Sequence, residues 1–216
     1  KALDDHGLIV PCCIAIRQWG DMHGWEDKLV MDEAKRRFDL GARIGAPYIV
    51  ATPPIEACDI STLPERYADL LHIGRETGIK PTFEYISFFK SIHQLSQAWD
   101  VVQQSGDSDA TLILDAFHNW NSGSTLNDLE QIPVDKISHY HIDDAHPDKP
   151  AQTQTDPDRV MIGDGVIDLK SEISILRNKG YKGAMSLELF NADLWAKDPK
   201  EVLKTGLERM RELIEL

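Results

Sequence analysis

The sequence has few cysteines, no long apolar run and no surplus of positive charge. Its three cysteines, Cys12, Cys13 and Cys58, lack the paired spacings of a disulfide framework or a zinc ribbon. We therefore expect free thiols and a cytoplasmic protein. No apolar stretch approaches the roughly 18 residues that a membrane span requires, and no segment has the features of a signal peptide. These absences argue against a membrane protein or a disulfide-rich secreted domain.

Positive charge is scarce, because 23 Lys and Arg against 36 Asp and Glu give a net charge of −13. A nucleic-acid-binding surface needs a basic stripe that neutralises phosphates, and the sequence contains none. The only dense basic cluster, residues 35–37, is flanked by acids, which indicates a solvated helix face. We expect no nucleic-acid partner and no membrane partner, whereas an acidic chain is well suited to binding a cation.

Short apolar runs alternate with longer stretches in which apolar residues lie three and four positions apart. The six predicted strands are residues 7–16, 48–52, 81–85, 111–115, 137–142 and 184–189. The predicted helices are residues 25–45, 63–78, 92–105, 127–131, 169–180 and 200–216. Residues 143–168 form a long, polar, Pro-rich connection, and loops of that length are usually functional.

Alternating strands and helices predict an α/β protein with a parallel sheet. An open nucleotide-binding sheet is disfavoured, because the turn after Ile16 reads RQWGDMHG and lacks a G-x-G-x-x-G sequence. Four of the six strands end at or near an ionisable residue, and TIM-barrel active sites lie at that end of the strands. We predict a single (β/α)8 TIM-barrel domain over residues 1–216, lacking about two N-terminal βα units because a closed barrel has eight.

The four strand-end residues are Glu84, Asp115, His141 and Glu188. A lone acid in such a place is more often a helix N-cap or a salt-bridge partner. Three converging buried acids, however, would repel one another and would be costly to desolvate, and a divalent cation removes both problems. Three carboxylates and one imidazole suit Mn²⁺ or Mg²⁺, with Co²⁺ or Zn²⁺ also admissible. We therefore predict that these residues bind one divalent metal ion.

Two more histidines lie near these strand ends. His118 follows Asp115 by three residues in the expected turn after the strand. It could be an ordinary loop histidine, but we favour a substrate contact or a general acid. His139 shares a strand face with His141, and we expect it to be a hydrogen-bonded core histidine rather than a ligand.

Five segments, EYI, LDAFH, HYHIDD, DRVMIGDGVIDL and SLELF, resemble in order and spacing the sugar isomerases and epimerases of the xylose-isomerase-like barrels. Within that family the inosose (2-keto-myo-inositol) isomerases are the most similar, and the resemblance runs from Gly7 to the C-terminus. It implies that the metal ligands are Glu84, Asp115, His141 and Glu188. It also implies that His118 contacts substrate and that Arg159, in the long connection, reaches the pocket.

The implied reaction moves a proton next to the carbonyl of a sugar or inosose through an enediolate. Glu84 and Glu188 would act as base and acid on either side of the substrate. Ketohexose epimerases carry an arginine where this chain has Pro147 and a glutamate where it has Lys90, so ketohexoses are disfavoured. The expected partner is a small-molecule substrate. A homo-oligomer is left open, because an open sheet edge invites pairing with another chain.

Three alternatives stay open at this point. The same site could eliminate water from an inosose, as a dehydratase does. An apurinic endonuclease on this barrel uses extra histidine ligands, but residues 156–159 read Asp-Pro-Asp-Arg, and the net charge of −13 opposes DNA binding. An inactive or regulatory barrel is the non-enzymatic alternative.

Overall fold

The computed structural model describes residues 1–215, and the chain divides into two compact units. Unit 1 comprises Lys1–Ile113, and unit 2 begins at Leu114. The division falls inside one strand, β4 (Leu112–Asp115), so each unit holds part of that strand. The predicted single domain over residues 1–216 stays a prediction.

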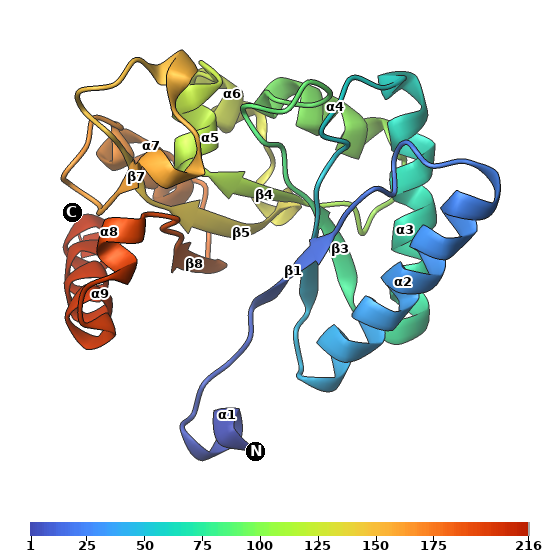
Figure 1. Ribbon diagram of the computed structural model, residues 1–216, viewed down its shortest axis with the longest axis horizontal. Coiled ribbons are helices and arrows are strands. Elements are labelled where there is room, and N and C mark those ends of the chain that lie inside the picture. The colour runs from blue at the N-terminus through green and yellow to red at the C-terminus, as the bar shows by residue number, and fades with distance from the viewer. Residues whose placement is uncertain (216) are drawn as a thin grey trace. The chain divides into compact units, whose positions relative to one another are not determined.

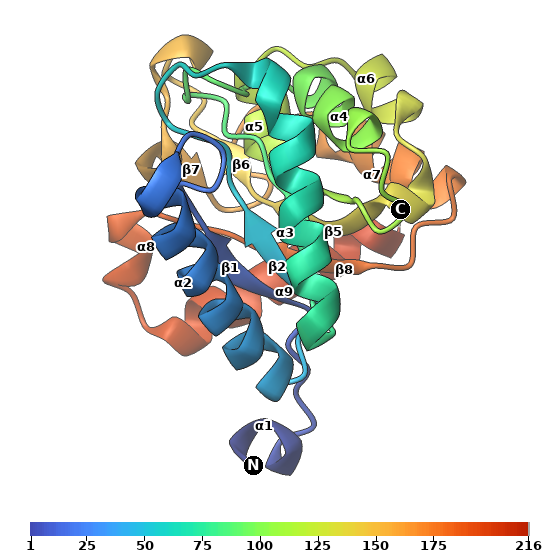
Figure 2. The same cartoon turned by 90° about the vertical axis from the view of Figure 1, so that its right-hand side faces the viewer.

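Unit 1 consists of parallel strands with helices between them. The strands pair in the order β1 (Cys12–Ile16), β2 (Tyr48–Ala51), β3 (Lys80–Phe83) and the start of β4. The helices are α1 (Ala2–Asp5), α2 (Gly24–Arg43), α3 (Leu63–Thr77), which follows the 3-10 helix η1 (Ile60–Thr62), and α4 (Leu95–Gln104). The two long helices α2 and α3 lie side by side and pack on strands of this unit (Figures 1 and 2).

An aromatic cluster forms part of the core of unit 1. The buried Tyr67 hydroxyl, on α3, donates to the carbonyl oxygens of Pro81 at 3.0 Å and Thr111 at 2.9 Å. The Trp19 ring meets the Phe83 ring edge-on at 5.7 Å and is fully buried. These contacts tie α3 to β3 and to the residue that precedes β4.

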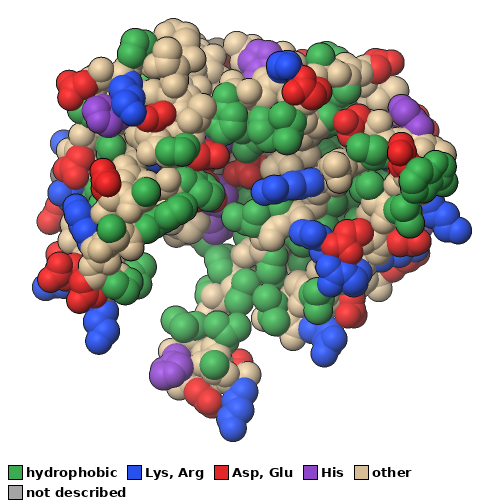
Figure 3. All heavy atoms as spheres, viewed as in Figure 1, with side chains coloured by type: hydrophobic (Ala, Val, Ile, Leu, Met, Phe, Trp, Pro, Cys, Tyr) green, Lys and Arg blue, Asp and Glu red, His purple; other side chains and the backbone are tan. Residues whose placement is uncertain are grey.

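The edge of unit 1 is apolar and exposed. β1 stands first in the strand order, and Leu8, Ile9 and Ile14 in and before it are 59%, 84% and 60% exposed. Figure 3 shows hydrophobic side chains gathered over the stretch that joins α1 to β1. Such an edge can pair with another chain, and the homo-oligomer stays a prediction.

Unit 2 contains the end of β4, followed in the pairing order by β5 (Ile137–Ile142) and β8 (Ala184–Leu187). The last two strands pair in parallel. The helices are α5 (Ala116–Asn121), α6 (Leu126–Gln131), α7 (Leu169–Asn178), α8 (Ala192–Trp195) and α9 (Pro199–Glu215), and a 3-10 helix, η2 (Val134–Lys136), precedes β5. α9, drawn in red in Figure 1, packs against α7.

The long connection after β5 is ordered. It contains η3 (Ala151–Thr153), η4 (Asp156–Asp158) and an antiparallel pair, β6 (Asp144–Ala145) with β7 (Arg159–Val160). The buried Asp144 carboxylate accepts four backbone N–H groups at 2.9–3.1 Å, from Ala145, Gly163, Gly165 and Ile167. One side chain therefore anchors both ends of the loop that carries Arg159.

All six predicted strands and all six predicted helices are present, with ends that differ by a few residues. The parallel α/β prediction is confirmed, and Gly78 caps α3 with a left-handed φ of +80°. Three short helices, α1, α5 and α8, were not predicted from the sequence. His118 lies in α5 rather than in an open turn. No helix within residues 1–215 is both long and apolar enough to cross a membrane.

Candidate metal centre

Asp115 ends β4 and serves two purposes. Its Oδ1 accepts the backbone N–H of His118 at 2.9 Å and so caps the N-terminus of α5. Its Oδ2 is 3.7 Å from Nδ1 of His141. The side chain is fully buried. The N-cap and the predicted ligand are therefore compatible, because each uses a different carboxylate oxygen.

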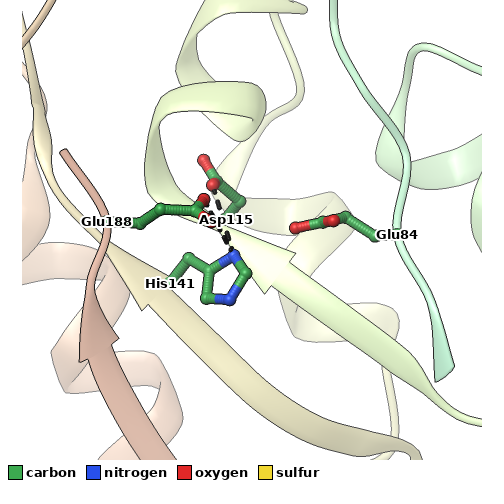
Figure 4. Close-up of side chains that lie close together, drawn as sticks. All are labelled: Glu84, Asp115, His141 and Glu188. Atoms are coloured by element: carbon green, nitrogen blue, oxygen red, sulfur yellow. Dashed lines mark ion pairs between the residues drawn. The ribbon is translucent and has the colours of Figure 1, made fainter. Parts of the chain in front are cut away.

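His141 and Glu188 meet because β5 and β8 are neighbours in the sheet. His141 pairs in register with Ser186, and the Glu188 N–H donates to the carbonyl of Ile142 at 3.3 Å. His141 Nδ1 lies 3.1 Å from Glu188 Oε2. One ligand atom each from Asp115, His141 and Glu188 lies within 4.8 Å of the other two (Figure 4). Three of the four predicted ligands thus converge within unit 2.

Glu84, the fourth predicted ligand, belongs to unit 1. It directly follows β3, its side chain is buried, and its backbone N–H donates to the carbonyl of Ala51 at 3.1 Å. Like the three predicted ligands of unit 2, it stands at or just beyond the C-terminal end of a strand. Its role in the metal centre stays a prediction.

Arg159 is the buried cation of the cluster, with a side chain only 1% exposed. Its Nη1 donates to Asp115 Oδ2 at 2.7 Å and to Glu188 Oε2 at 3.3 Å, and it also hydrogen-bonds Asp143. Its Nη2 donates to Asp156 Oδ1 at 2.9 Å. Arg159 therefore pairs with two of the predicted metal ligands. Its predicted contact with substrate stays a prediction.

The charges of the cluster shift the pKa values of its members. Burial by itself would raise the pKa of Asp115, but Arg159, His118 and His141 together outweigh burial and hold that pKa well below its usual range. Burial raises the pKa of Asp143 well above its usual range, only partly opposed by Arg159. Burial disfavours the Arg159 charge, yet the surrounding carboxylates raise its pKa. The surroundings therefore favour the anionic form of Asp115, whereas burial disfavours the anionic form of Asp143.

These residues fit a divalent cation. Asp115, Glu188 and Asp156 surround a single guanidinium, so acids outnumber the cation that balances them. Two carboxylates and one imidazole nitrogen are donors that Mn²⁺, Co²⁺ and Zn²⁺ accept. The donor atoms Asp115 Oδ2, His141 Nδ1 and Glu188 Oε2 also converge on one another, as a metal site requires.

His118 is a neutral imidazole with a defined tautomer. Its Nε2 lies 3.1 Å from Nη2 of Arg159, and a guanidinium can only donate, so Nε2 accepts and the proton is on Nδ1. Burial lowers the His118 pKa to about 4. The structure places His118 against Arg159, and its predicted contact with substrate stays a prediction.

His139 is the core histidine that the strand pattern predicts. Its Nε2 lies 2.7 Å from the Ser186 hydroxyl, and its side chain is buried. Burial, aided by the neighbouring His141, lowers the His139 pKa to about 4. It contributes to packing beside His141 rather than to the cluster of ligand atoms.

Two acids that bind Arg159, Asp143 and Asp156, were not predicted from the sequence. Asp143 could have been predicted as a site residue, because it directly follows a predicted strand. Asp156 could not have been predicted, because it lies in a polar loop whose path the sequence does not define.

The comparisons with known proteins agree with this arrangement. The family described as xylose isomerase-like TIM barrel matches residues 1–213. The chain belongs to the xylose isomerase-like TIM barrel family. Among its relatives in this family, an inosose isomerase of Halalkalibacterium halodurans is 32% identical over 198 residues, which cover 87% of this chain and 68% of that protein. A second inosose isomerase, from Bacillus licheniformis, is 30% identical over 196 residues, covering 86% of this chain and 69% of that protein.

Solved structures confirm the predicted xylose-isomerase-like TIM-barrel fold. A crystal structure of the IOLI protein with a bound zinc atom has a TM-score of 0.90 at 24% identity, covering 99% of this chain and 80% of that one. An L-ribulose 3-epimerase has a TM-score of 0.77 at 18% identity, covering 99% and 77%. The relatives place this family member among proteins named as sugar isomerases and epimerases.

Proposed function

We propose that the protein is a divalent-metal-dependent isomerase or epimerase that moves a proton next to the carbonyl of an inosose or a related sugar. The observation that carries this proposal is the convergence of Asp115 Oδ2, His141 Nδ1 and Glu188 Oε2. The two inosose isomerases that share 32% and 30% of their residues with this chain support the choice of substrate class.

The proposed ligands are Asp115, His141 and Glu188 from unit 2 and Glu84 from unit 1. Each stands at or just beyond the C-terminal end of a strand, which is where TIM-barrel enzymes build their sites. The cation is Mn²⁺, Mg²⁺, Co²⁺ or Zn²⁺, and the zinc in the IOLI structure supports such a site. Bound there, it would draw electron density from a substrate carbonyl and so acidify the adjacent C–H.

Glu188 and Glu84 are the proposed proton-transfer groups. Glu188 is 17% exposed, more than Asp115 or His141, so a substrate can reach its carboxylate. One of the two glutamates, as a carboxylate, would take the proton from the α-carbon, and the other, as a carboxylic acid, would donate its own proton to the neighbouring carbon. The neutral His118 and the cationic Arg159 would hold substrate oxygens.

Exchange of substrate hydrogen with solvent tests this role. In D₂O the wild-type protein with Mn²⁺ should incorporate deuterium into an inosose next to its carbonyl, as NMR would show. Glu188→Gln should lower the exchange rate by roughly 10²–10⁴-fold. Glu201→Gln, the same change at an exposed site on α9, is the matched control and should leave the rate unaltered. A near-normal rate of hydrogen exchange between substrate and solvent in Glu188→Gln would contradict the proposed role of Glu188.

Dehydration on the same site is the second candidate. A 3-dehydroshikimate dehydratase of Pseudomonas putida is 24% identical over 193 residues, which cover 86% of this chain and 30% of that protein. Both reactions begin by removing a proton next to a carbonyl, so the same glutamates would serve. Product analysis distinguishes them: an isomerase conserves substrate mass, whereas a dehydratase yields a product lighter by one water.

A further inference from the structure

A cavity lies within unit 2 among α5, α6 and α7. It has a volume of 160 Å³, which is close to that of cavities known to hold a benzene-sized molecule. Trp120, Leu126, Leu129 and Ile167 give it apolar walls, and Glu172 of α7 contributes a carboxylate. The metal centre described above does not include any of these residues.

Glu172 is held in the cavity by one of its two oxygens. Its Oε2 accepts the Tyr140 hydroxyl at 2.9 Å and the Asn119 amide at 2.8 Å, and the residue is only 6% exposed. Tyr140 projects from the face of β5 opposite to His141. Within residues 1–215 no group donates a hydrogen bond to Oε1. Oε1 therefore keeps its capacity to accept a hydrogen bond, and a bound ligand can supply the donor.

The surroundings of Glu172 supply no positive charge. The cavity lining contains no Lys or Arg, and the charged groups that act on Glu172, Asp168 and Asp115, are both acids. Burial raises the pKa of Glu172 to about 7, a shift that the bonds from Asn119 and Tyr140 only partly oppose. A cation that enters the cavity would therefore gain a carboxylate partner that no protein group neutralises.

We propose that this cavity binds a small free alkylammonium ion, whose ammonium group pairs with Glu172 and whose chain packs against Trp120 and Leu129. The lining disfavours a hydrated metal ion, because its carboxylates come only from Glu172 and from Asp168, which already accepts two hydrogen bonds from Ser171, and the remaining walls are largely apolar. The ring of Trp120 adds a favourable contact for an organic cation. The volume admits a chain of about four carbons with its ammonium group.

Titration calorimetry with n-butylammonium tests the proposal on the full chain at pH 8, where Glu172 is mostly ionised. We expect saturable millimolar binding to the wild type and at least tenfold weaker binding to Glu172→Gln. The neutral analogue n-butanol should bind both proteins alike, because it lacks the charge. The absence of saturable butylammonium binding to the wild type, or equal affinity for both proteins, would overturn the proposal.

A second variant keeps the test independent of the Glu172 network. Leu126 lines the cavity and is 41% exposed, so Leu126→Trp should close the mouth without disturbing Tyr140 or Asn119. It should lose butylammonium binding while its melting temperature stays near that of the wild type. Unchanged binding in this variant would contradict the assignment. If a lysine with blocked α-amino and α-carboxyl groups bound more tightly than butylammonium, the assignment of the ligand as a small free alkylammonium ion would be wrong.

Discussion

At the scale of single residues, Arg159 is the buried cation that neutralises the acids around the candidate metal centre. Its guanidinium is buried and donates to Asp115 Oδ2 and Glu188 Oε2, two of the atoms that we propose as metal donors. The rings of Phe117 and Phe190 lie 4.9 Å and 5.6 Å from it and shield it from water. The arginine and a divalent cation therefore stabilise the same acids, and either one can lower the cost of burying them.

Replacement of this arginine should be destabilising in a metal-dependent way. Arg159→Gln leaves Asp115, Glu188 and Asp156 without their buried cation, and such a loss typically costs about 3–5 kcal/mol. Added Mn²⁺ should restore part of this stability and should raise the melting temperature of the variant more than that of the wild type. Thermal unfolding with EDTA and with Mn²⁺ measures both effects.

Arg209→Gln is the control for this experiment. Its guanidinium also binds an acid, Asp164, but it is about one-third exposed, so its removal should cost far less. If Arg159→Gln were as stable as Arg209→Gln in EDTA, the charge-balance account of Arg159 would be wrong.

Glu172 should make stability depend on pH. Because its folded-state pKa of about 7 exceeds its ordinary value of 4.5, the folded protein keeps a proton that the unfolded chain loses. The free energy of unfolding should therefore fall as pH rises from 4.5 to 7, by about 3 kcal/mol at most. Glu172→Gln lacks this contribution, so the difference in unfolding free energy between the wild type and the variant isolates it. Urea titrations between pH 4.5 and 7 measure both free energies. A difference that stays constant with pH would contradict the buried carboxylate.

Several site residues could be predicted from sequence, because strand alternation and strand ends are local features. Asp115, His141 and Glu188 close apolar runs, and neighbouring parallel strands bring such ends together. The pairing of Arg159 with Asp115 could not be predicted, because it depends on the path of a long loop across 44 positions of sequence. The Glu172 cavity was missed for a similar reason, since Glu172 reads as one more polar residue of a helix.

At the scale of elements, the connection between β5 and α7 depends on Asp144. Its carboxylate accepts the N–H groups of Gly163, Gly165 and Ile167, which lie about twenty residues away. The turn needs glycine at 165, because a Cβ there would lie 2.3 Å from the carbonyl oxygen of Ala145. These contacts fix β7 beside β6 and thereby place Arg159 in the cluster.

Asp144→Ala should loosen this connection while leaving the strands in place. The variant leaves three loop N–H groups without their acceptor, and each lost bond to a charged acceptor is worth roughly 1.5–3 kcal/mol. Hydrogen exchange should accelerate at Gly163, Gly165 and Ile167, and metal affinity should fall as Arg159 loses its position. Asp164→Ala removes a more exposed acid of the same loop and is the matched control. Unchanged exchange at the three amides would contradict the anchoring role.

The predicted elements differ in how well they match the structure, for physical reasons. The strand at residues 137–142 is reproduced without change as β5, because it is bounded by Pro133 on one side and by two acids on the other. The first strand is shorter than predicted, because the apolar residues 7–11 lie at an exposed edge without a partner strand. α5 was missed because AFHNWN is too short for helical periodicity.

At the scale of the whole molecule, family membership and chemistry support each other. The xylose isomerase-like TIM barrel family matches nearly the whole chain, residues 1–213. The net charge of −13 disfavours a polyanionic substrate and is compatible with a bound cation. The account therefore depends on one central claim, that the acids and the histidine at the strand ends bind a divalent metal ion.

Elemental analysis of protein purified without chelator and then equilibrated with Mn²⁺ tests this claim most directly, with Asp115→Ala and the exposed-site control Glu201→Gln treated in parallel. The account predicts about one divalent cation per chain in the wild type and in Glu201→Gln, and a loss of that cation in Asp115→Ala. A wild-type protein that retains no divalent cation, or an Asp115→Ala variant that retains it fully, would contradict the proposed centre.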